Sequence, residues 1–510
     1  MIFILESFFD KKWRFFGVSF WEKRGINRKS IHPHGYLVVG PNYRVAPWRS
    51  AMRNHIGKST RALALLLLFC VAESCKQQDS STDAGALAPL LLGGASDAQL
   101  LGALNNAGVT ALSAPPAQDP ALVALGRSLF FDKELSGDRN ISCSTCHSPA
   151  GFTGDALSTS IGAGGTGENQ LRVVSSGSMV ARNAPPLFNL GAGNTRMFWD
   201  GRVSRDNATG ALTTPESTLN GITPARADVA SQLTSALAAQ AMFPVASDVE
   251  MRGAVGNEIR AAADNQAVWA ALMARLVGTN NGTTGGMAAY RSLFSAAYPG
   301  VAYDDLNFGH AARAIAAFET ASYAAVHSPL DEFLRGNPNA LSADAKAGGL
   351  LFFGRAGCGG CHRGPLLSDA NFHGIAAPQL GPGASGGDDQ GRFLISGSAN
   401  DNYHFRTPAL RNVELTAPYT HAGAYTTLAA VIAHYSDTAT GLRNYNGAGL
   451  RADYAATVDT NASHIQARLN ARDPRVVRPL GLNATEQAQI EAFLKSLTDP
   501  SARNLSPDGN

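Results

Sequence analysis

The pentapeptide pattern C-x-x-C-H occurs twice in this chain, at residues 143–147 and 358–362. Two cysteines at this spacing can each form a thioether bond with a vinyl group of one porphyrin, and the histidine that follows can bind the iron. The pattern therefore predicts two covalently attached haem c groups, which any fold of the chain must accommodate. The residues predicted to hold the haems are Cys143, Cys146, His147, Cys358, Cys361 and His362.

Two other cysteine chemistries fit part of the pattern. Four cysteines could hold a zinc ion, and each C-x-x-C pair could form a thioredoxin-like redox centre. Neither alternative requires a histidine directly after both pairs, so the haem interpretation is preferred. The other two cysteines, Cys70 and Cys75, lie in or just after a predicted leader, which leaves no cysteine for structural disulfides in the mature protein.

The first 75 residues indicate export. Three basic residues precede an apolar run over residues 62–72, which matches a signal-peptide core and is too short to span a bilayer comfortably. Met52 is a candidate for the true start, with residues 1–51 as an upstream extension. The segment 71–75 resembles a lipoprotein cleavage box, so a lipid-anchored Cys75 and a soluble periplasmic form both stay open. We expect a periplasmic protein, because bacterial c-type haems are attached outside the cytoplasm.

Charge and length set the remaining limits. The 42 basic and 40 acidic residues leave a formal net charge of +2. The chain contains no basic block and no patch of interleaved basic and aromatic residues, so nucleic acid is not an expected partner. A chain of 510 residues is long enough for two domains.

Sequence blocks recur in the same order in the two halves of the chain. Residues 126–131 (GRSLFF) precede the first haem motif, and residues 348–353 (GGLLFF) precede the second. After the motifs, residues 185–189 (PPLFN) are echoed by residues 408–412 (PALRN). We therefore predict a mainly α-helical fold of two cytochrome c-like haem domains, related by an internal duplication and packed face to face.

Domain boundaries follow from this repeat and from composition. A stretch rich in Ser, Ala and Gly after the leader is typical of a linker. The predicted segments are an upstream extension with export signal at 1–75, a linker at 76–115, an N-terminal haem c domain at 116–325, a C-terminal haem c domain with a terminal helix at 326–500, and a tail at 501–510.

Apolar spacing predicts helices at three places. Leucines recur at helical intervals over residues 122–129, apolar residues do so over 308–318, and residues 484–497 form a predicted C-terminal helix. No run of alternating residues is long enough to predict a central sheet.

Axial ligands of the haems are constrained by what the chain lacks. There is no methionine after Met287, so the second haem cannot take a methionine ligand from its own half. There is no histidine between His147 and His310, so the first haem has no distal histidine from its own half. We therefore expect an open first iron, which is the catalytic arrangement rather than that of an electron carrier.

The chain resembles the bacterial di-haem cytochrome c peroxidase and MauG superfamily from about Leu122 to Leu497. Many specific blocks occur in the family's order. They are LGRSLFFDKELS, ISCSTCH, RNAPPLFN, FWDGR, AIAAFE, CGGCHRGPLLSD, FRTPALRNVELTAPYTHAGAY and the HY pair that ends at Tyr435.

The resemblance implies roles around the first haem. His147 would be the proximal ligand of the peroxide-reactive haem, and Glu250 would be the distal carboxylate that moves a proton between the peroxide oxygens. Gln240 matches a distal glutamine that could hydrogen-bond to peroxide. Trp199 matches the tryptophan that lies between the two haems. A solvated surface acid at Glu250 and a purely structural indole at Trp199 are the plainer alternatives.

Around the second haem, the resemblance implies His362 as the proximal ligand. Tyr435 falls where peroxidases of the family have methionine and MauG-type members have tyrosine. His434 is an alternative ligand, and Tyr435 packed in the core without ligation is another. His373 and His421 lie in blocks near this haem and are candidates for contact with its propionates.

The resemblance also implies a calcium ion between the haems. Asn183, Thr416 and Pro418 match the family's calcium site, which uses an amide oxygen and backbone carbonyls suited to a hard cation.

Three functions remain open. The first is a periplasmic peroxidase that reduces hydrogen peroxide with electrons from a small cytochrome c or cupredoxin. The alternative is a MauG-like oxidase that modifies side chains of a partner protein through an Fe(IV) state shared by two haems. The third is an electron-transfer cytochrome without catalysis. Members of the family often form dimers, so a homodimer is a further expectation.

Overall fold

A computed structural model describes residues 88–177 and 179–506. These residues belong to one compact unit, Gly85–Asn510. The predicted export signal, the lipid-anchored Cys75 and the candidate start at Met52 lie outside the described residues. Within the described ranges, no helix is both long and apolar enough to cross a bilayer.

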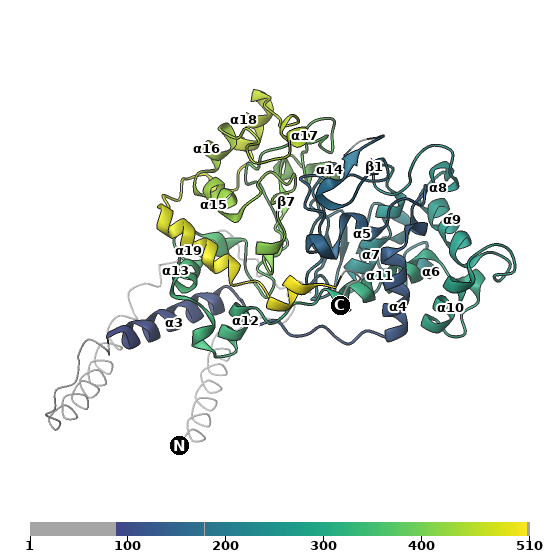
Figure 1. Ribbon diagram of the computed structural model, residues 1–510, viewed down its shortest axis with the longest axis horizontal. Helices are drawn as coiled ribbons and strands as arrows, with labels where there is room; N and C mark the ends of the chain where they lie inside the picture. Colours follow the sequence, from purple (N-terminus) through teal and green to yellow (C-terminus); the bar gives the residue numbers. More distant parts are fainter. Residues whose placement is uncertain (1–87, 178, 507–510) are drawn as a thin grey trace, which may run out of the picture. The chain divides into compact units, whose positions relative to one another are not determined.

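Helices form most of the regular structure in the first half (Figure 1). The predicted helix at residues 122–129 is confirmed, and it begins at Asp119, whose side chain accepts hydrogen bonds from the first backbone N–H groups. The predicted helix at residues 308–318 is confirmed as well. The α-helices of this half are α4 (Pro120–Phe131), α5 (Cys143–Cys146), α6 (Ala227–Ala230), α7 (Ala236–Ala241), α8 (Glu258–Ala261), α9 (Asn265–Val277), α10 (Ala288–Ala297) and α11 (Phe308–Ser322).

The second half is also helical. Its predicted C-terminal helix begins at the expected residue, where Asn483 and Glu486 form a capping box, and ends two residues early. The α-helices of this half are α12 (Pro329–Leu334), α13 (Ala343–Phe353), α14 (Phe393–Ser396), α15 (Leu428–Ser436), α16 (Thr438–Arg443), α17 (Ala452–Ala455), α18 (Ala462–Asn470) and α19 (Ala484–Lys495).

Strands in the described part of the chain are short and antiparallel. β1 pairs with β2, β4 lies between β3 and β5, and β6 pairs with β7. The expectation of a mainly helical fold without a central sheet is therefore confirmed. The strands are β1 (Gly165–Thr166), β2 (Val173–Val174), β3 (Arg196–Met197), β4 (Val203–Arg205), β5 (Leu212–Thr213), β6 (Phe372–His373) and β7 (Phe405–Arg406).

One helix crossing recurs in both halves. α4 packs on α11 at Gly126, where an added Cβ would lie 1.9 Å from the carbonyl oxygen of Ala314. α13 packs on α19 at Gly348, where an added Cβ would lie 1.8 Å from the carbonyl oxygen of Gln489. Both glycines belong to the repeated sequence blocks. Each lets two helix backbones approach more closely than any larger residue would allow.

Three phenylalanine rings pack at each crossing with matching geometry. The ring centroids are 5.1, 5.2 and 5.8 Å apart in the first triplet, and 5.1, 5.3 and 5.8 Å apart in the second. Such edge and tilted contacts stabilise a core beyond the area that they bury. The triplets are Phe130, Phe131 and Phe318, and Phe352, Phe353 and Phe493.

The buried apolar residues divide into two principal cores. The first is built from residues 122–323, and the second combines residues 100–109 with residues 330–497. In Figure 1 the helices of the first core are blue to teal, and α13, α15 and α19 of the second are green to yellow.

The predicted linker at 76–115 is wrong over its second part. Ala88–Asn106 form α3, and its Leu100 and Leu104 are fully buried in the second core. Lys346 of α13 bonds to Asp97 of this helix at 2.8 Å. The small residues of this segment predicted a flexible linker. The helix forms because burial of its two leucines against the second core stabilises it. Residues 76–87 lie outside the described range.

The predicted tail at 501–510 is packed over its described part. A 3₁₀ helix, η12 (Pro500–Asn504), buries Ala502 against Phe188 and Ala325. The end of the chain thus contacts residues of the first half, just as α3 contacts the second.

Candidate haem sites

The first C-x-x-C-H motif lies on a single helical turn at the wall of a large cavity, here called the first cavity. Cys143 and Cys146 begin and end α5, and His147 follows as its C-cap. All three residues line the cavity. The His147 Nδ1–H donates to the carbonyl oxygen of Thr153 at 3.1 Å. That bond leaves Nε2 as the unprotonated nitrogen, which is the form that binds iron.

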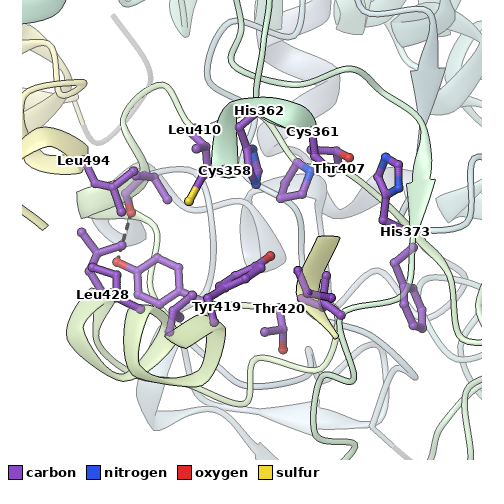
Figure 2. A pocket seen from close by; sticks show the side chains of 18 of the residues that line it. Cys358, Cys361, His362, His373, Thr407, Leu410, Tyr419, Thr420, Leu428 and Leu494 are labelled. Carbon is purple, nitrogen blue, oxygen red and sulfur yellow. Dashed lines mark hydrogen bonds between the residues drawn. The ribbon is translucent and has the colours of Figure 1, made fainter. Parts of the chain in front are cut away.

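The second motif lines a separate cavity, here called the second cavity. Cys358 opens the 3₁₀ turn η8 (Cys358–Gly360), and Cys361 and His362 follow. The His362 Nδ1–H donates to the carbonyl oxygen of Leu367 at 2.9 Å, the same arrangement as in the first motif. Figure 2 shows this motif on one side of the cavity, with Tyr419, Thr420 and Leu428 facing it from the other.

Both cavities suit a haem. They contain about 1730 and 1610 Å³ of space between protein atoms, part of it open to solvent. Apolar side chains supply most of both linings, as a porphyrin face requires.

The geometry disfavours the other cysteine chemistries. The four cysteines are divided between two cavities, so they do not form one four-cysteine zinc site. Burial raises the pKa of Cys143 to about 12 and that of Cys361 to about 11. Redox pairs and zinc ligands need thiolates, whose pKa values lie below the ordinary one.

Glu250 and Gln240 line the first cavity together with His147. Glu250 lies in a turn after the 3₁₀ helix η5 (Pro244–Ala246), and its backbone N–H donates to the carbonyl oxygen of Ser247 at 3.2 Å. Gln240 is carried by α7. Burial raises the pKa of Glu250, and the positive charge of Arg202 opposes that rise. A carboxyl group that lines the cavity beside the haem motif can accept a proton and return it.

His147 is the only histidine among the described residues that line the first cavity. Two methionines, Met197 and Met251, also line it, and both are buried in the first core. The prediction of an open first iron excluded a histidine ligand from this half of the chain and did not address methionine.

Trp199 lines both cavities, as do Asn183 and Arg406. Its indole N–H donates to the carbonyl oxygen of Asn183 at 2.9 Å, and its own carbonyl oxygen accepts from the Arg406 N–H at 2.7 Å. One bond fixes the ring and the other fixes the backbone of Trp199, so the indole is held between the two candidate haem sites.

The three predicted calcium residues line one small cavity between the halves of the compact unit. Asn183 Nδ2 donates to the carbonyl oxygen of Leu157 at 2.8 Å, which leaves its Oδ1 to accept. Asp155 lines the same cavity, and its buried Oδ2 has no hydrogen-bond partner in the part of the chain that the structure describes. Burial raises the pKa of Asp155 to about 6. These oxygens fit a hard cation. Asp155 was missed because only the matched triad was considered.

Tyr435, on α15, lines the second cavity, whereas His434 does not. The Tyr435 hydroxyl has no hydrogen-bond partner among the described residues, and burial raises its pKa. The His434 Nε2–H donates to the carbonyl oxygen of Ile375 at 2.9 Å. The structure thus brings Tyr435 to the site and leaves its neighbour outside.

His373 and His421 also line the second cavity. His373 lies between Asp369 and Asp473, at 3.1 and 2.8 Å. His421 stacks on Phe405 at 3.6 Å between ring centroids, and burial lowers its pKa to about 3.

One carboxyl group in the first cavity was not predicted. Glu319 of α11 lines the cavity, and within residues 88–177 and 179–506 its Oε2 has no hydrogen-bond partner. Burial raises the pKa of Glu319 to about 8. It stands four residues after Ile315, on the buried face of the helix. A charged residue on an otherwise apolar helix face was the available indication.

Comparison with known proteins agrees with this geometry. Residues 120–339 match the family model described as di-haem cytochrome c peroxidase. The cytochrome c551 peroxidase of Pseudomonas aeruginosa is 30% identical over 302 residues, which cover 59% of this chain and 67% of that protein. The methylamine utilization protein MauG of Methylorubrum extorquens is 29% identical over 318 residues, 62% of this chain and 69% of that protein.

A solved structure supports the fold as well. The crystal structure of a MauG-like protein associated with microbial copper homeostasis is 26% identical, with a TM-score of 0.52, over 77% of this chain and 94% of that one. The crystal structure of the diheme peroxidase BthA from Burkholderia thailandensis is 21% identical, with a TM-score of 0.50. The match covers 77% of this chain and 90% of that one.

Proposed function

Because this chain belongs to the family of di-haem cytochrome c peroxidases and MauG-type oxidoreductases, we propose that it reduces hydrogen peroxide with electrons from an external protein donor. One observation supports this most strongly. Glu250 and the first haem motif line the same cavity, in which His147 is the only histidine among the described lining residues.

Two haem c groups would be held by the two motifs. Cys143 and Cys146 would anchor the first, with His147 as iron ligand, and the equivalent residues of the second motif would hold the other. When bound, the first haem supplies the electrons that break the O–O bond. Tyr435 is the proposed distal ligand of the second iron.

Glu250 is the proposed proton carrier. Its carboxylate takes the proton from the inner peroxide oxygen and delivers it to the outer oxygen, which leaves as water. A raised pKa suits this exchange, since the group gives the proton back as readily as it takes it. Gln240 is proposed to hold the bound peroxide by a hydrogen bond.

Trp199 is the proposed electron relay. It lines both cavities, and its two backbone-anchored hydrogen bonds fix the ring between them. Electrons from the donor would enter at the second haem and pass this ring.

A second candidate function is oxidation of a partner protein's side chains, as a MauG-like activity. Tyr435 in the second cavity favours it, because an anionic oxygen ligand stabilises an oxidised iron. The two functions differ in the lifetime of the peroxide-oxidised protein when no donor is present. A long-lived oxidised form supports the second function, and rapid decay supports the first.

Three structural proposals accompany the function. We propose calcium at the cavity of Asn183, Thr416 and Pro418, to be checked by metal analysis of the holoprotein. We propose an internal duplication, supported by the two matching helix crossings and phenylalanine triplets. We propose a periplasmic location, as the need for haem attachment outside the cytoplasm suggests.

Turnover with a reduced small c-type cytochrome tests the function. The purified holoprotein should oxidise this donor only when hydrogen peroxide is added, with two donor molecules consumed per peroxide. A donor that stays reduced in the presence of peroxide, while both haems are attached, would contradict the peroxidase proposal.

A further inference from the structure

The mouth of the first cavity carries aliphatic side chains from both halves of the compact unit. Val249 is 42% exposed, Leu394 39% and Ile395 43%, and all three line the cavity. Since these side chains border the cavity and also contact solvent, they lie where the cavity opens. We call them the aliphatic rim.

The rim is held in place rather than carried on a free loop. Leu394 and Ile395 lie on the one-turn helix α14, which ends at Gly397 with a φ of +66°. Arg392, just before this turn, donates from Nη1 to the carbonyl oxygens of Asp200 and Gly201, at 2.9 and 3.1 Å. Two exposed aliphatic residues are therefore fixed against the segment that also carries Trp199.

Apolar surface continues from the rim towards the catalytic carboxyl group. Val249 directly precedes Glu250, and Pro244, Val245 and Met251 also line the cavity. A molecule that placed its reactive end at Glu250 would therefore keep its other end against the rim.

Two of the arginines that line this cavity are paired with carboxylates. Arg202 contacts Asp200 at 3.1 Å, and Arg182 bonds to Asp389 at 2.6 Å. The third, Arg406, is buried and donates to the carbonyl oxygens of Phe198 and Thr407. The exposed residues of the rim are aliphatic, so the rim itself carries no charge.

Hydrogen peroxide has no apolar part that could use such a rim. An alkyl hydroperoxide, R–O–O–H, has one, and it would bury R against the rim while its O–O bond lies at Glu250. We propose that the first cavity accepts alkyl and aryl-alkyl hydroperoxides as substrates. This inference deepens, and rests on, the proposed peroxidase function.

The reaction is balanced in the same way as with hydrogen peroxide. The O–O bond of R–O–O–H breaks, two electrons come from two molecules of the one-electron protein donor, and two protons are taken up. The products are the alcohol R–O–H and water. Glu250 again moves the proton, here from the inner oxygen to the outer one.

Rate constants for three peroxides test the inference. The diferric holoprotein is mixed with hydrogen peroxide, tert-butyl hydroperoxide and cumene hydroperoxide, and the ratio of each organic constant to the hydrogen peroxide constant is measured. Leu394→Asp and Ile395→Asp should each lower the cumene ratio by about tenfold, because a charged group replaces apolar contact with R. Ile222→Asp, at a residue 72% exposed and away from both cavities, should leave the ratio unchanged.

The outcomes separate the two proposals. Fast reaction with hydrogen peroxide, but organic hydroperoxides reacting only at the rate of free haem, would overturn the inference and leave the peroxidase function intact. A cumene ratio that the rim variants do not change would also overturn it. Failure of all three peroxides would remove the peroxidase function and the inference together. Leu394→Ala replaces the Asp variant if that chain loses its haem absorption, with a smaller fall of the ratio expected.

Discussion

The two haem cavities have the same arrangement around the motif histidine but differ in the other side chains that line them. In both, the motif histidine donates its Nδ1–H to a backbone carbonyl oxygen, 3.1 Å away in the first and 2.9 Å in the second. Opposite the first motif the chain provides carboxyl and amide groups, Glu250 and Gln240. In the second cavity it provides a phenol, Tyr435, among aliphatic side chains. The two motifs thus position their histidines in the same way. The other lining residues decide which reaction each iron can support.

This difference teaches how one recurring arrangement, a C-x-x-C-H motif on the wall of a cavity, can serve two purposes. A cavity with a titratable carboxyl and an open mouth suits a reaction that moves protons. A cavity that holds a phenol and mostly apolar side chains suits storage or passage of electrons. Each main variant below replaces one residue that lines one or both of the cavities.

Glu250→Gln should have the largest effect. The amide cannot exchange a proton, so the rate constant for peroxide reduction should fall by about 10²- to 10³-fold, the range of general acid–base catalysis. Stopped-flow absorption of the diferric holoprotein measures it. The burial-raised pKa of Glu250 also predicts that the wild-type rate falls on acidification at a pH above 4.5, and that the variant loses this dependence.

Two controls accompany this variant. Glu168→Gln changes an exposed carboxyl outside the cavity and should react like wild type. Glu319→Gln changes a second carboxyl group of the same cavity, one that no arginine pairs among the described residues, unlike Asp200. If Glu319→Gln abolished the peroxide reaction and Glu250→Gln did not, the proton-carrier role would belong to Glu319.

Tyr435→Phe should change the second haem alone. Loss of an anionic oxygen ligand should raise the midpoint potential of that haem by on the order of 0.1 V, within the ~0.8 V range that axial ligands span. Spectroelectrochemical titration measures the two potentials separately.

Tyr425→Phe is the matched control for this change. Tyr425 is also buried in the second half with an unpartnered hydroxyl, but it does not line the cavity. Equal shifts in the two variants would show that Tyr435 packs in the core without binding iron.

Glu319→Gln should remove a pH dependence of stability. Burial raises the pKa of Glu319 to about 8, so the folded state keeps a proton that the unfolded state loses near pH 4.5. Its contribution to stability is full below pH 4.5 and is lost as the pH rises towards 8. Relative to the variant, the wild-type holoprotein should lose about 3 to 4 kcal/mol of unfolding free energy between pH 5 and 8.

Urea unfolding at several pH values, followed by tryptophan fluorescence, measures this loss. Glu168→Gln should keep the wild-type slope. Parallel slopes for wild type and Glu319→Gln would mean that Glu319 is already ionised or bonded in the holoprotein.

Trp199→Phe should have the smallest effect on stability and a selective effect on electron flow. Loss of the indole hydrogen bond to Asn183 should cost about 1 kcal/mol. The peroxide step should stay close to wild type, while oxidation of the second haem lags behind it. Dual-wavelength stopped-flow follows both haems.

Trp269→Phe loses a comparable buried hydrogen bond, from its indole to Met242 at 2.8 Å, but lines neither haem cavity. Synchronous oxidation of both haems in Trp199→Phe would rule out the relay.

Local patterns predicted the local structure well. Helical spacing located α4, α11 and α19, and the haem motifs placed each histidine beside its cysteines. These features depend on residues within one or two turns of each other, so the sequence contains the whole pattern. The helix α3 was missed because its interior is rich in small residues, and burial of Leu100 and Leu104 against the distant residues of the second core stabilises it.

Long-range neighbours could be reached only through family resemblance. Nothing in the spacing between residue 147 and residue 250 says that they share a cavity, and the resemblance supplied Glu250, Trp199 and Tyr435. The resemblance included Glu319 in the matched block AIAAFE but gave it no role, and it did not supply Asp155 or the aliphatic rim. These roles depend on which side chains the packing turns towards each cavity.

The most direct test of the account is a peroxide titration of the fully oxidised holoprotein, followed by visible and near-infrared absorption. The account predicts rapid reaction at the first haem without prior reduction, because no second histidine from the described lining closes that iron. No reaction until one haem has been reduced would contradict it, and would mean that another side chain, such as Met197 or Met251, occupies the position proposed to be open.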